Sequence, residues 1–325
     1  MTAFETADSR TNQEARYTVV VPAYNASETV ERAIKSVRAQ TMPSWRLVVV
    51  DDGSTDNTLA VAERLARGDP AIRVIHQANA GVASARNTAI ERSRTEFVTF
   101  LDADDELDPE YLRMMDEFIG AYPGYDIYHS NLRILAPDGS ESLFSDCAVV
   151  TSFDLGDLLK ECVIGIGATM RTSSLRGLGG FRSGIHCEDY DLWLRALADG
   201  QRAIYLPSPL YLYHQEHAIR RSANSRAGVT DLIASIEELL TIRAIPRELV
   251  PSALDAIDRN CRLLSQLDSE AEMRAQADRF YGRLEQLLGG KGTRLAQRLT
   301  SRLRRHVVPI RRRMAERQAL KRDGQ

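Results

Sequence analysis

Short apolar runs alternate with segments of helical periodicity along the first third of the chain. The apolar runs are rich in Val, Ile and Phe, and helical segments of about 10–14 residues separate them. The four predicted strands are Tyr17–Val21, Arg46–Val50, Ala71–Ile75 and Phe97–Leu101. Continuous apolar runs are typical of strands buried on both faces, so the pattern predicts an α/β fold with a doubly wound, mostly parallel sheet.

Polar loops with unusual chemistry follow these strands, and parallel strands bring such loops to one edge of a sheet, where ligands bind. The fourth loop carries Asp102, Asp104 and Asp105 directly after F-V-T-F-L. Carboxylates held this close repel each other unless a cation lies between them. Oxygen ligands suit Mg²⁺ or Mn²⁺ together with substrate phosphates. The alternative is an acidic loop that caps the next helix, as Asp108 before Pro109 is expected to do.

Periodicity weakens beyond about residue 120, and the later elements are less regular. We expect strands at 125–132, 202–206 and 210–213, and helices at 153–161 and 188–200. The G-I-G-A-T-M run in this region lacks the third glycine of a dinucleotide-binding fingerprint and follows no clear strand, which excludes that function. From about residue 228 onward the pattern is nearly all helical.

Composition bounds the architecture. With 325 residues, 43% of them hydrophobic and 27% charged, the chain can bury a sizeable core and is not globally disordered. One large domain with an appendage, or two domains, fits this length. The predicted divisions are a frayed N-terminus at 1–16, an α/β domain at 17–225, a helical extension at 226–290 and a basic tail at 291–325.

Cysteine usage and apolar runs indicate the compartment. The four cysteines form no C-x-x-C pair and match no zinc spacing, so free thiols in a reducing compartment are expected. The first 16 residues contain acids and no apolar core typical of a secretory signal. No run approaches the roughly 18 apolar residues of a transmembrane helix. We therefore expect a cytoplasmic protein.

The tail at 291–325 is strongly basic, with 12 Lys and Arg against 2 Asp and Glu. Leu295, Leu299, Leu303 and Val307 recur every four residues, which predicts an amphipathic helix. Such a helix can lie on an anionic membrane surface. It could instead dock on the acidic body of the same chain, or pair with a second copy in a homo-oligomer. Nucleic acid is not an expected partner, because no aromatic residues are interleaved for base stacking.

Five motifs occur in order along the chain. They are V-V-V-P-A-Y-N at 19–25, V-V-D-D-G-S-T-D at 49–56, N-A-G-V-A-S-A-R-N at 79–87, F-L-D-A-D-D at 100–105 and E-D-Y-D-L-W-L-R at 188–195. With these motifs the chain resembles the family 2 glycosyltransferases, inverting enzymes of the GT-A fold. The resemblance covers roughly residues 17–222.

The resemblance implies roles for particular residues. Those expected to bind the donor nucleotide are Pro22, Ala23, Tyr24, Asp52, Arg86 and Asp102. Those expected to bind the metal are Asp104 and His214. Asp189 is expected to be the catalytic base, and Glu188 is the neighbour that could replace it. Because a carboxylate only accepts hydrogen bonds, Asp52 suits the N–H edge of a base, commonly uracil.

Each of these residues also has a structural alternative. Asp52 could belong to a helix-entry turn, and Arg86 could be a solvated helix cation. A lone histidine at a strand end, such as His214, is more often structural. Acids in a first helical turn also favour the helix dipole, which could account for one of Glu188, Asp189 and Asp191 but not readily for all three.

The function expected from the resemblance is sugar transfer from a nucleotide-sugar, with a UDP-sugar expected, to an acceptor hydroxyl. It would require Mn²⁺ or Mg²⁺ and serve cell-surface polysaccharide or glycolipid synthesis. A glycan or lipid-linked acceptor is expected, at the cytoplasmic face of the membrane. Two alternatives are a non-catalytic nucleotide-sugar-binding protein on a GT-A fold and a sugar-1-phosphate nucleotidyltransferase. The glycine-rich Arg/Lys signature of the latter is missing, since the first loop is P-A-Y-N.

Overall fold

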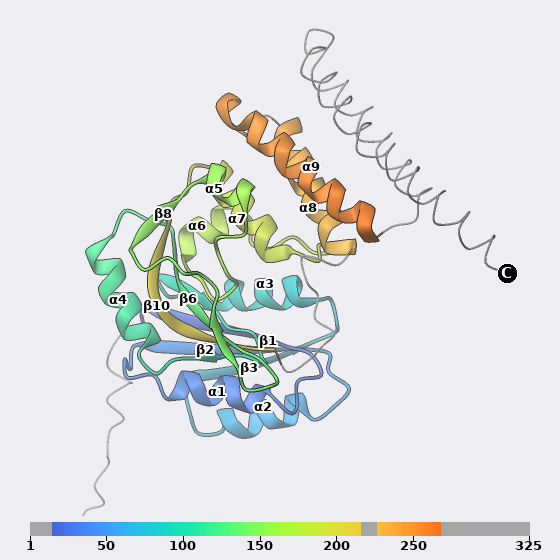
Figure 1. Ribbon diagram of the computed structural model, residues 1–325. Helices are drawn as coiled ribbons and strands as arrows, with labels where there is room; N and C mark the ends of the chain where they lie inside the picture. The colour runs from blue at the N-terminus through green and yellow to red at the C-terminus, as the bar shows by residue number, and fades with distance from the viewer. Residues whose placement is uncertain (1–14, 216–225, 243, 268–325) are drawn as a thin grey trace, which may run out of the picture. The chain divides into compact units, whose positions relative to one another are not determined.

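The computed structural model describes residues 15–215, 226–242 and 244–267 (Figure 1). The chain divides into two compact units, one ending at Ala253 and the other beginning at Leu254. The first unit contains the sheet and helices α1 to α8, and helix α9 (Val250–Leu267) crosses the division. The predicted basic helix at 291–325 lies outside the described residues, as do residues 1–14 of the predicted frayed N-terminus.

The first half of the sheet is parallel, as the apolar runs predicted. Its strands are β1 (Tyr17–Ala23), β2 (Trp45–Asp52), β3 (Ile72–Gln77) and β4 (Phe97–Phe100), in the order β3-β2-β1-β4. Helices α1 (Val30–Arg38) and α2 (Thr58–Ala66) lie on one face, and α3 (Val82–Arg92) lies on the other (Figure 1). The apolar residues of α1 at helical spacing, Val30, Ala33, Ile34 and Val37, are fully buried. This packing brings the ends of β1, β2 and β4 to one edge.

The second half of the sheet is mixed. Beyond β4 the order continues with β9 (Thr169–Arg171), β6 (Ile127–Leu135), β10 (Ala203–His214) and β5 (Glu106–Leu107). The short strands β7 (Glu141–Leu143) and β8 (Thr151–Phe153) pair with β6 and β10. Strand β9 is antiparallel to both β4 and β6, whereas β6 and β10 run parallel. The prediction of a mostly parallel sheet is confirmed, with these short antiparallel strands added.

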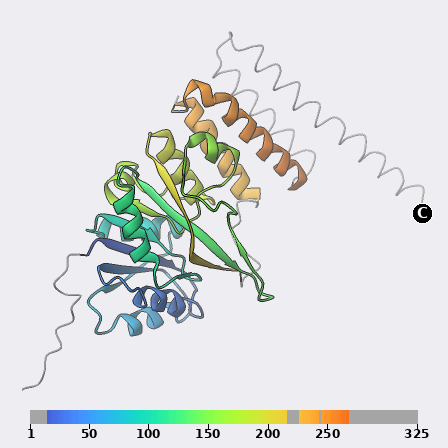
Figure 2. The ribbon, with the colours of Figure 1, turned by 60° about the vertical axis from the view of Figure 1, so that its left-hand side comes forward.

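Strand β10 is one strand where the sequence predicted two. Its pairing with β6 shifts register between Leu206 and Pro209 and again between Pro209 and Tyr211. Proline has no N–H to donate to a ladder, so the shift at this point follows from the sequence P-S-P. Figure 2 shows β6 and β10 as the two long strands lying side by side. His214 ends β10 and pairs with Leu135.

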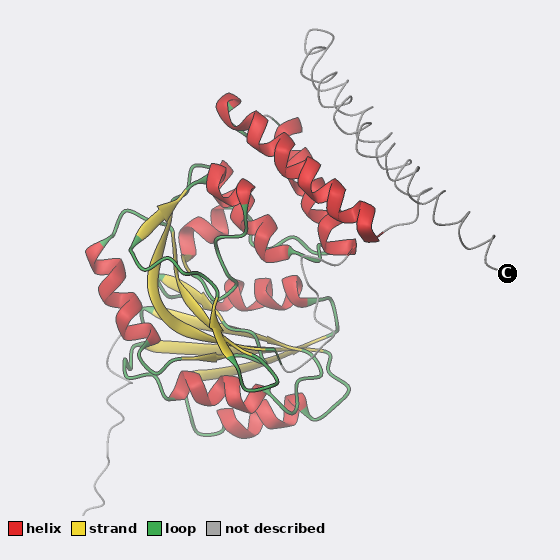
Figure 3. Ribbon diagram, in the orientation of Figure 1, coloured by secondary structure: helices red, strands yellow, loops and turns green. Residues whose placement is uncertain are grey.

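Further helices lie around the sheet, and α8 packs against α7 rather than against the strands (Figure 3). They are α4 (Tyr111–Ala121), α5 (Leu155–Lys160), α6 (Thr172–Gly177), α7 (Glu188–Ala198), α8 (Arg226–Thr241) and a short 3₁₀ turn at Arg247–Leu249. Asp108 was expected to cap α4, but α4 begins at Tyr111. The Asp108 Oδ1 atom instead accepts a hydrogen bond of 2.9 Å from the Glu110 N–H, within the turn before the helix.

The predicted domain limits after residues 16 and 225 can be compared with the contacts that Arg16 and helix α8 make. Arg16, at the end of the predicted frayed segment, forms ion pairs of 2.9 Å with Glu96 and 2.5 Å with Asp116. Helix α8, at the start of the predicted extension, packs against α7 within the sheet-containing unit.

Within the described part of the chain, no helix combines the length and apolarity needed to cross a membrane.

Candidate active site

A cavity of about 490 Å³ opens at the carboxyl edge of the parallel strands. Its lining contains six of the predicted site residues: Pro22, Tyr24, Arg86, Asp102, Asp104 and Asp189. The structure therefore joins the first, third, fourth and fifth motifs around one space. Ala23, Asp52 and His214 are not among its lining residues.

Three carboxylates gather beside the cavity, and two of them, Asp102 and Asp104, line it. Asp102, Asp104 and Asp105 each place a carboxylate oxygen within 4.8 Å of the others. Asp105 is fully buried, and its oxygens accept hydrogen bonds of 2.8 Å from the Tyr211 hydroxyl and of 2.8 Å from the His214 N–H. Burial, reinforced by the charges of Asp102 and Asp104, raises the pKa of Asp105 well above its usual value. Asp102 and Asp104 face the cavity, and oxygen donors of this kind fit a divalent cation.

His214 lies beside this cluster but its ring is directed to another partner. The imidazole Nε2 atom lies 2.8 Å from Glu106 Oε1, and the backbone N–H of His214 donates to Asp105. The ring is outside the group of atoms that could share one ion in the described residues. Its assignment as a metal ligand stays a prediction.

Asp52 holds the loop that follows β3. Its Oδ1 atom accepts hydrogen bonds from Gln77 Nε2 (2.7 Å) and the Ala80 N–H (3.0 Å), and its Oδ2 atom accepts one from the Gly81 N–H (2.8 Å). Gly53 permits this arrangement, because its φ is 71° and a Cβ there would lie 2.7 Å from the backbone N of Asn79. The carboxylate thus has a structural task, and its contact with a nucleotide base stays a prediction.

Asn25 joins the loops after β1 and β2, and the sequence analysis assigned it no role. Its backbone has a φ of 48°, which Asn tolerates better than most residues. The side-chain Oδ1 atom of Asn25 accepts a hydrogen bond of 2.9 Å from the Thr55 N–H. The backbone N–H of Asn25 donates a hydrogen bond of 3.0 Å to Ser54 Oγ. The sequence signal for this role is the asparagine that follows P-A-Y at the end of a strand. This loop presents Tyr24, whose side chain is half-exposed at the cavity.

Arg86 is buried between two carboxylates. Its Nη2 atom donates to Asp102 Oδ1 (2.7 Å), and its Nη1 atom donates to Glu188 Oε1 (2.6 Å). The guanidinium also lies over the Phe181 ring, with 5.1 Å from Cζ to the ring centroid. Burial lowers the pKa of Arg86, but the charges of Asp102 and Glu188 outweigh it and raise the pKa overall. Arg86 therefore links the acidic loop to the start of α7, and its predicted nucleotide contact stays untested.

Asp189 lies in the first turn of α7 and at the cavity wall. Its Oδ1 atom accepts a hydrogen bond of 2.8 Å from the Tyr190 N–H. Burial, together with the charge of Glu188, raises the pKa of Asp189 to about 6, although Arg86 opposes the shift. A carboxyl group with a pKa near neutrality, in a cavity, is suited to act as a general base.

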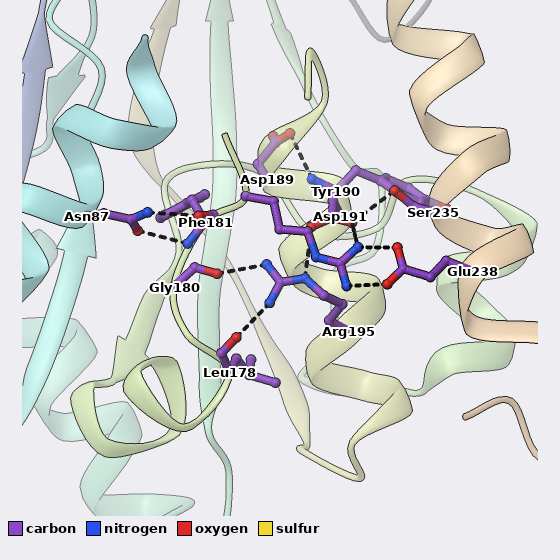
Figure 4. A network of polar contacts seen from close by, with 11 residues as sticks. Asn87, Leu178, Gly180, Phe181, Asp189, Tyr190, Asp191, Arg195, Ser235 and Glu238 are labelled. Carbon is purple, nitrogen blue, oxygen red and sulfur yellow. Dashed lines mark hydrogen bonds and ion pairs between the residues drawn. The ribbon is translucent and has the colours of Figure 1, made fainter. Parts of the chain in front are cut away.

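Helix α7 is fixed by a buried polar network (Figure 4). Asp191 accepts hydrogen bonds from Arg195 Nε (2.8 Å) and from Ser235 Oγ of α8 (2.9 Å). Arg195 also donates to the carbonyls of Leu178 (3.0 Å) and Gly180 (2.8 Å). These contacts give Asp191 a structural role in joining α7 to α8.

The segment before α7 is held from both sides. Asn87 of α3 pairs with the backbone of Phe181 by two hydrogen bonds, of 2.8 Å and 2.9 Å (Figure 4). Arg182 pairs with Glu238 of α8 at 2.5 Å and 3.0 Å. The segment that leads to Asp189 is thus anchored on α3 and on α8.

Comparison with known proteins identifies the family. Residues 18–140 match Glycosyl transferase family 2, and residues 97–224 match Glycosyl transferase family group 2. UDP-Glc:alpha-D-GlcNAc-diphosphoundecaprenol beta-1,3-glucosyltransferase WfgD of Escherichia coli is 32% identical over 188 residues, which cover 56% of this chain and 69% of WfgD. Putative teichuronic acid biosynthesis glycosyltransferase TuaG of Bacillus subtilis is 33% identical over 162 residues, which cover 48% of this chain and 61% of TuaG.

Other curated relatives match over a smaller part of their length. The match to the uncharacterized glycosyltransferase YibD of Escherichia coli, at 39% identity over 98 residues, covers 30% of this chain and 28% of YibD. Such matches leave most of the relative unaligned.

Solved structures confirm the GT-A fold. Residues 1–349 of S. aureus TarS, in complex with UDP-GlcNAc, align with a TM-score of 0.64 at 19% identity over 92% of both chains. Mannosyltransferase PcManGT from Pyrobaculum calidifontis, in complex with GDP-Man and Mn²⁺, aligns with a TM-score of 0.55 at 20% identity, over 91% of this chain and 86% of PcManGT. With WfgD matched over more than two thirds of its length, this chain belongs to glycosyltransferase family 2.

Proposed function

We propose that the chain is a metal-dependent inverting glycosyltransferase that moves a sugar from a UDP-sugar to an acceptor hydroxyl. The observation that carries this proposal is that Asp189 lines the same cavity as Asp102 and Asp104. A proton acceptor and a site for a diphosphate-bound cation are thereby within reach of one bound donor. The name of WfgD includes UDP-Glc, and TarS is described in complex with UDP-GlcNAc, which supports UDP as the nucleotide.

The transfer would proceed by a single displacement at the anomeric carbon. Asp189 takes the proton of the attacking hydroxyl, since a carboxyl with a pKa of about 6 is mostly ionised at neutral pH. Glu188 is less suited to this task, because its Oε1 atom already receives the Arg86 hydrogen bond. A single displacement needs no enzyme nucleophile, and the four free cysteines are then not required for the chemistry.

The acidic loop would hold Mn²⁺ or Mg²⁺ together with the donor diphosphate. A bound divalent ion would neutralise the charge that develops on the departing diphosphate. Asp104 and Asp102 face the cavity with their carboxylates, and Arg86 keeps Asp102 in position. PcManGT, described in complex with Mn²⁺, supports a divalent ion without deciding which one this chain uses.

The acceptor is proposed to be a glycan or a lipid-linked sugar in cell-surface polysaccharide or glycolipid synthesis. The names of WfgD and TuaG, which include a diphosphoundecaprenol-linked sugar and teichuronic acid, support this class. The amphipathic pattern predicted for 291–325 supports a place at the cytoplasmic membrane face. The family relationship gives no support to a sugar-1-phosphate nucleotidyltransferase.

The experiment is a screen of UDP-, GDP- and dTDP-sugars for release of free nucleotide, with Mn²⁺, with Mg²⁺ or with EDTA. We expect a UDP-sugar to release UDP in the presence of a divalent ion and not in EDTA. Binding of a nucleotide-sugar without any release, with or without candidate acceptors, would instead indicate a non-catalytic binding protein. Release that is equally fast in EDTA would contradict the metal requirement.

A further inference from the structure

His186 precedes α7 by two positions, and its half-exposed side chain lines the cavity. Asp189 lines the same cavity, and only Cys187 and Glu188 separate the two residues along the chain. A group beside the proposed base lies next to the acceptor hydroxyl rather than next to the nucleotide. The five motifs gave no role to this residue.

Asp231 of α8 fixes both the ring and the backbone of His186. Its Oδ2 atom lies 2.8 Å from His186 Nδ1 and accepts a hydrogen bond of 2.7 Å from the His186 N–H. A carboxylate only accepts hydrogen bonds, so Nδ1 carries the proton of the neutral ring. The lone pair is then on Nε2, and among the described residues the ring makes no second hydrogen bond.

The rest of α8 keeps this arrangement in place. Ser235 donates to the buried Asp191, and Glu238 pairs with Arg182 at the other end of the segment before α7. Asp231 and Ser235, one turn apart on α8, therefore hold His186 and the first turn of α7, whereas the partly exposed pair of Glu238 with Arg182 contributes little. An orientation fixed this way is typical of a side chain that contacts a substrate rather than of a solvated surface histidine.

The charges on this side of the cavity select the kind of group that His186 can meet. Glu188 and Asp189 are acidic, and the Arg86 guanidinium is already paired with two carboxylates. A phosphate placed here would face like charges, whereas a neutral hydroxyl can donate a hydrogen bond to a nitrogen lone pair. Sugars carry such hydroxyls on neighbouring carbons.

We propose that His186 is an acceptor-binding residue whose Nε2 atom accepts a hydrogen bond from a hexose hydroxyl adjacent to the one that Asp189 deprotonates. Asp231 is the positioning residue that sets the tautomer and orientation of the ring. This inference rests on the proposed function, and it assigns α8 a part in selecting the acceptor.

The decisive variant is His186→Asn. The Asn amide N–H can replace Nδ1–H toward Asp231, but Asn has no atom at the position of Nε2. The acceptor KM, measured with the best of a panel of p-nitrophenyl hexosides, should rise about 2- to 12-fold, the range expected for one lost hydrogen bond. The KM for the UDP-sugar in acceptor-free hydrolysis and the unfolding temperature should stay unchanged.

Two further variants separate positioning from packing. Asp231→Asn removes the carboxylate that fixes the tautomer, so it should also raise the acceptor KM while donor hydrolysis is retained. Glu238→Gln, on the same helix, breaks only a partly exposed ion pair, and such pairs contribute little. It should leave the acceptor KM within twofold of the wild-type value.

The outcomes distinguish this inference from the proposed function. If His186→Asn keeps the wild-type acceptor KM, the role of His186 is overturned and the proposed function stands. The same holds if the wild-type chain hydrolyses the UDP-sugar but transfers sugar to no hexoside. An equal rise in acceptor KM for Glu238→Gln would mean that His186 and Asp231 act only by packing this segment, which would overturn the inference. Absence of both hydrolysis and transfer in the wild-type chain would remove the proposed function itself.

Discussion

Arg86 and Glu188, which are 102 residues apart in the sequence, form a buried ion pair in which Nη1 lies 2.6 Å from Oε1. The pair connects α3 with the first turn of α7. It commits one oxygen of Glu188 to a cation, whereas the neighbouring Asp189 lines the cavity with a raised pKa. This relationship separates the two acids that the E-D-Y-D motif offers as bases.

Asp189→Asn should lower kcat by about 10²- to 10⁴-fold, the usual contribution of a general base. Donor affinity should change little, because the amide keeps the shape of the carboxyl group and its bond to the Tyr190 N–H. Glu188→Gln is the matched variant and should cost much less, since an amide oxygen can still accept from Arg86. Steady-state kinetics check both, and the opposite ranking would assign the base to Glu188.

Ionised Asp189 should cost stability, and the cost should depend on pH. Its folded pKa of about 6 lies above the ordinary value of 3.8, so the folded state binds this proton more tightly than the unfolded state. The resulting stability is present below about pH 4 and is lost as pH rises through 6. Asp189→Asn should therefore raise the unfolding temperature at pH 8, by an amount that shrinks toward pH 4.

The control for this pH dependence is the exposed turn residue Asp138. Hydrogen bonds from Ser140 lower the pKa of Asp138, so Asp138→Asn should show no such gain at high pH. Thermal unfolding without metal or nucleotide, from pH 4 to pH 8, measures both. A pH-independent difference for Asp189→Asn would show that its carboxyl is not destabilised by burial.

Asp104→Asn should abolish metal-stimulated transfer and weaken donor binding, because the charge of the diphosphate would be left uncompensated. Asp108→Asn changes an acid that directly follows β5 and lies outside the three-carboxylate cluster, so it should keep both properties. Calorimetric titration with UDP and Mn²⁺, alongside turnover, separates binding from catalysis. Near-normal turnover of Asp104→Asn in EDTA would refute the metal assignment.

Gly180→Ala should destabilise the chain more than Gly68→Ala. Both glycines have positive φ, of 72° and 78°, so alanine costs about 1–2 kcal/mol of backbone strain at either position. A Cβ at Gly180 would also clash with Asn87 Oδ1, whereas a Cβ at Gly68 meets no atom within 4 Å. Denaturant unfolding measures the free energy of unfolding of both variants. Equal decreases would mean that the Asn87 side chain moves away from the added Cβ without loss of stability.

The basic tail should bind anionic membranes. Each basic residue near such a surface contributes roughly 1 kcal/mol, and the predicted apolar stripe would insert between the headgroups. The full chain should float with liposomes that contain anionic lipid, and a chain ending at Gly290 should not. Equal flotation of both chains, or none at low salt, would leave docking on the same chain or pairing with a second copy.

The parallel half of the fold could be predicted largely because strands β1, β2 and β4 are buried on both faces. Val19 and Leu47, for example, lie in continuous apolar runs that few other elements produce. Strands β5, β7, β8 and β9 contain only two or three residues each, too few to show an alternating pattern. Their pairing is set by distant partners, which no local window of sequence contains.

The candidate site was predictable where a motif carries its own chemistry. Asp102, Asp104 and Asp189 could be found as acids at a strand end and a helix start. The burial of Asp105 could not, because it depends on Tyr211 and on the backbone of His214. Likewise, the pairing of Arg86 with two carboxylates depends on α7 approaching α3, which spacing along the sequence does not reveal.

The carboxylate of Asp105 accepts a hydrogen bond from Tyr211, which lies 106 positions later in the chain and is therefore synthesised after it. At roughly 5–20 residues per second, about 5–20 s of synthesis separate the two partners. During that interval the acidic loop is outside the ribosome before strand β10, which buries one of its carboxyl groups, has been made. A nascent chain therefore exposes the acidic loop before the proposed cation site is complete. We therefore expect sugar transfer only after the last strand of the sheet has been added.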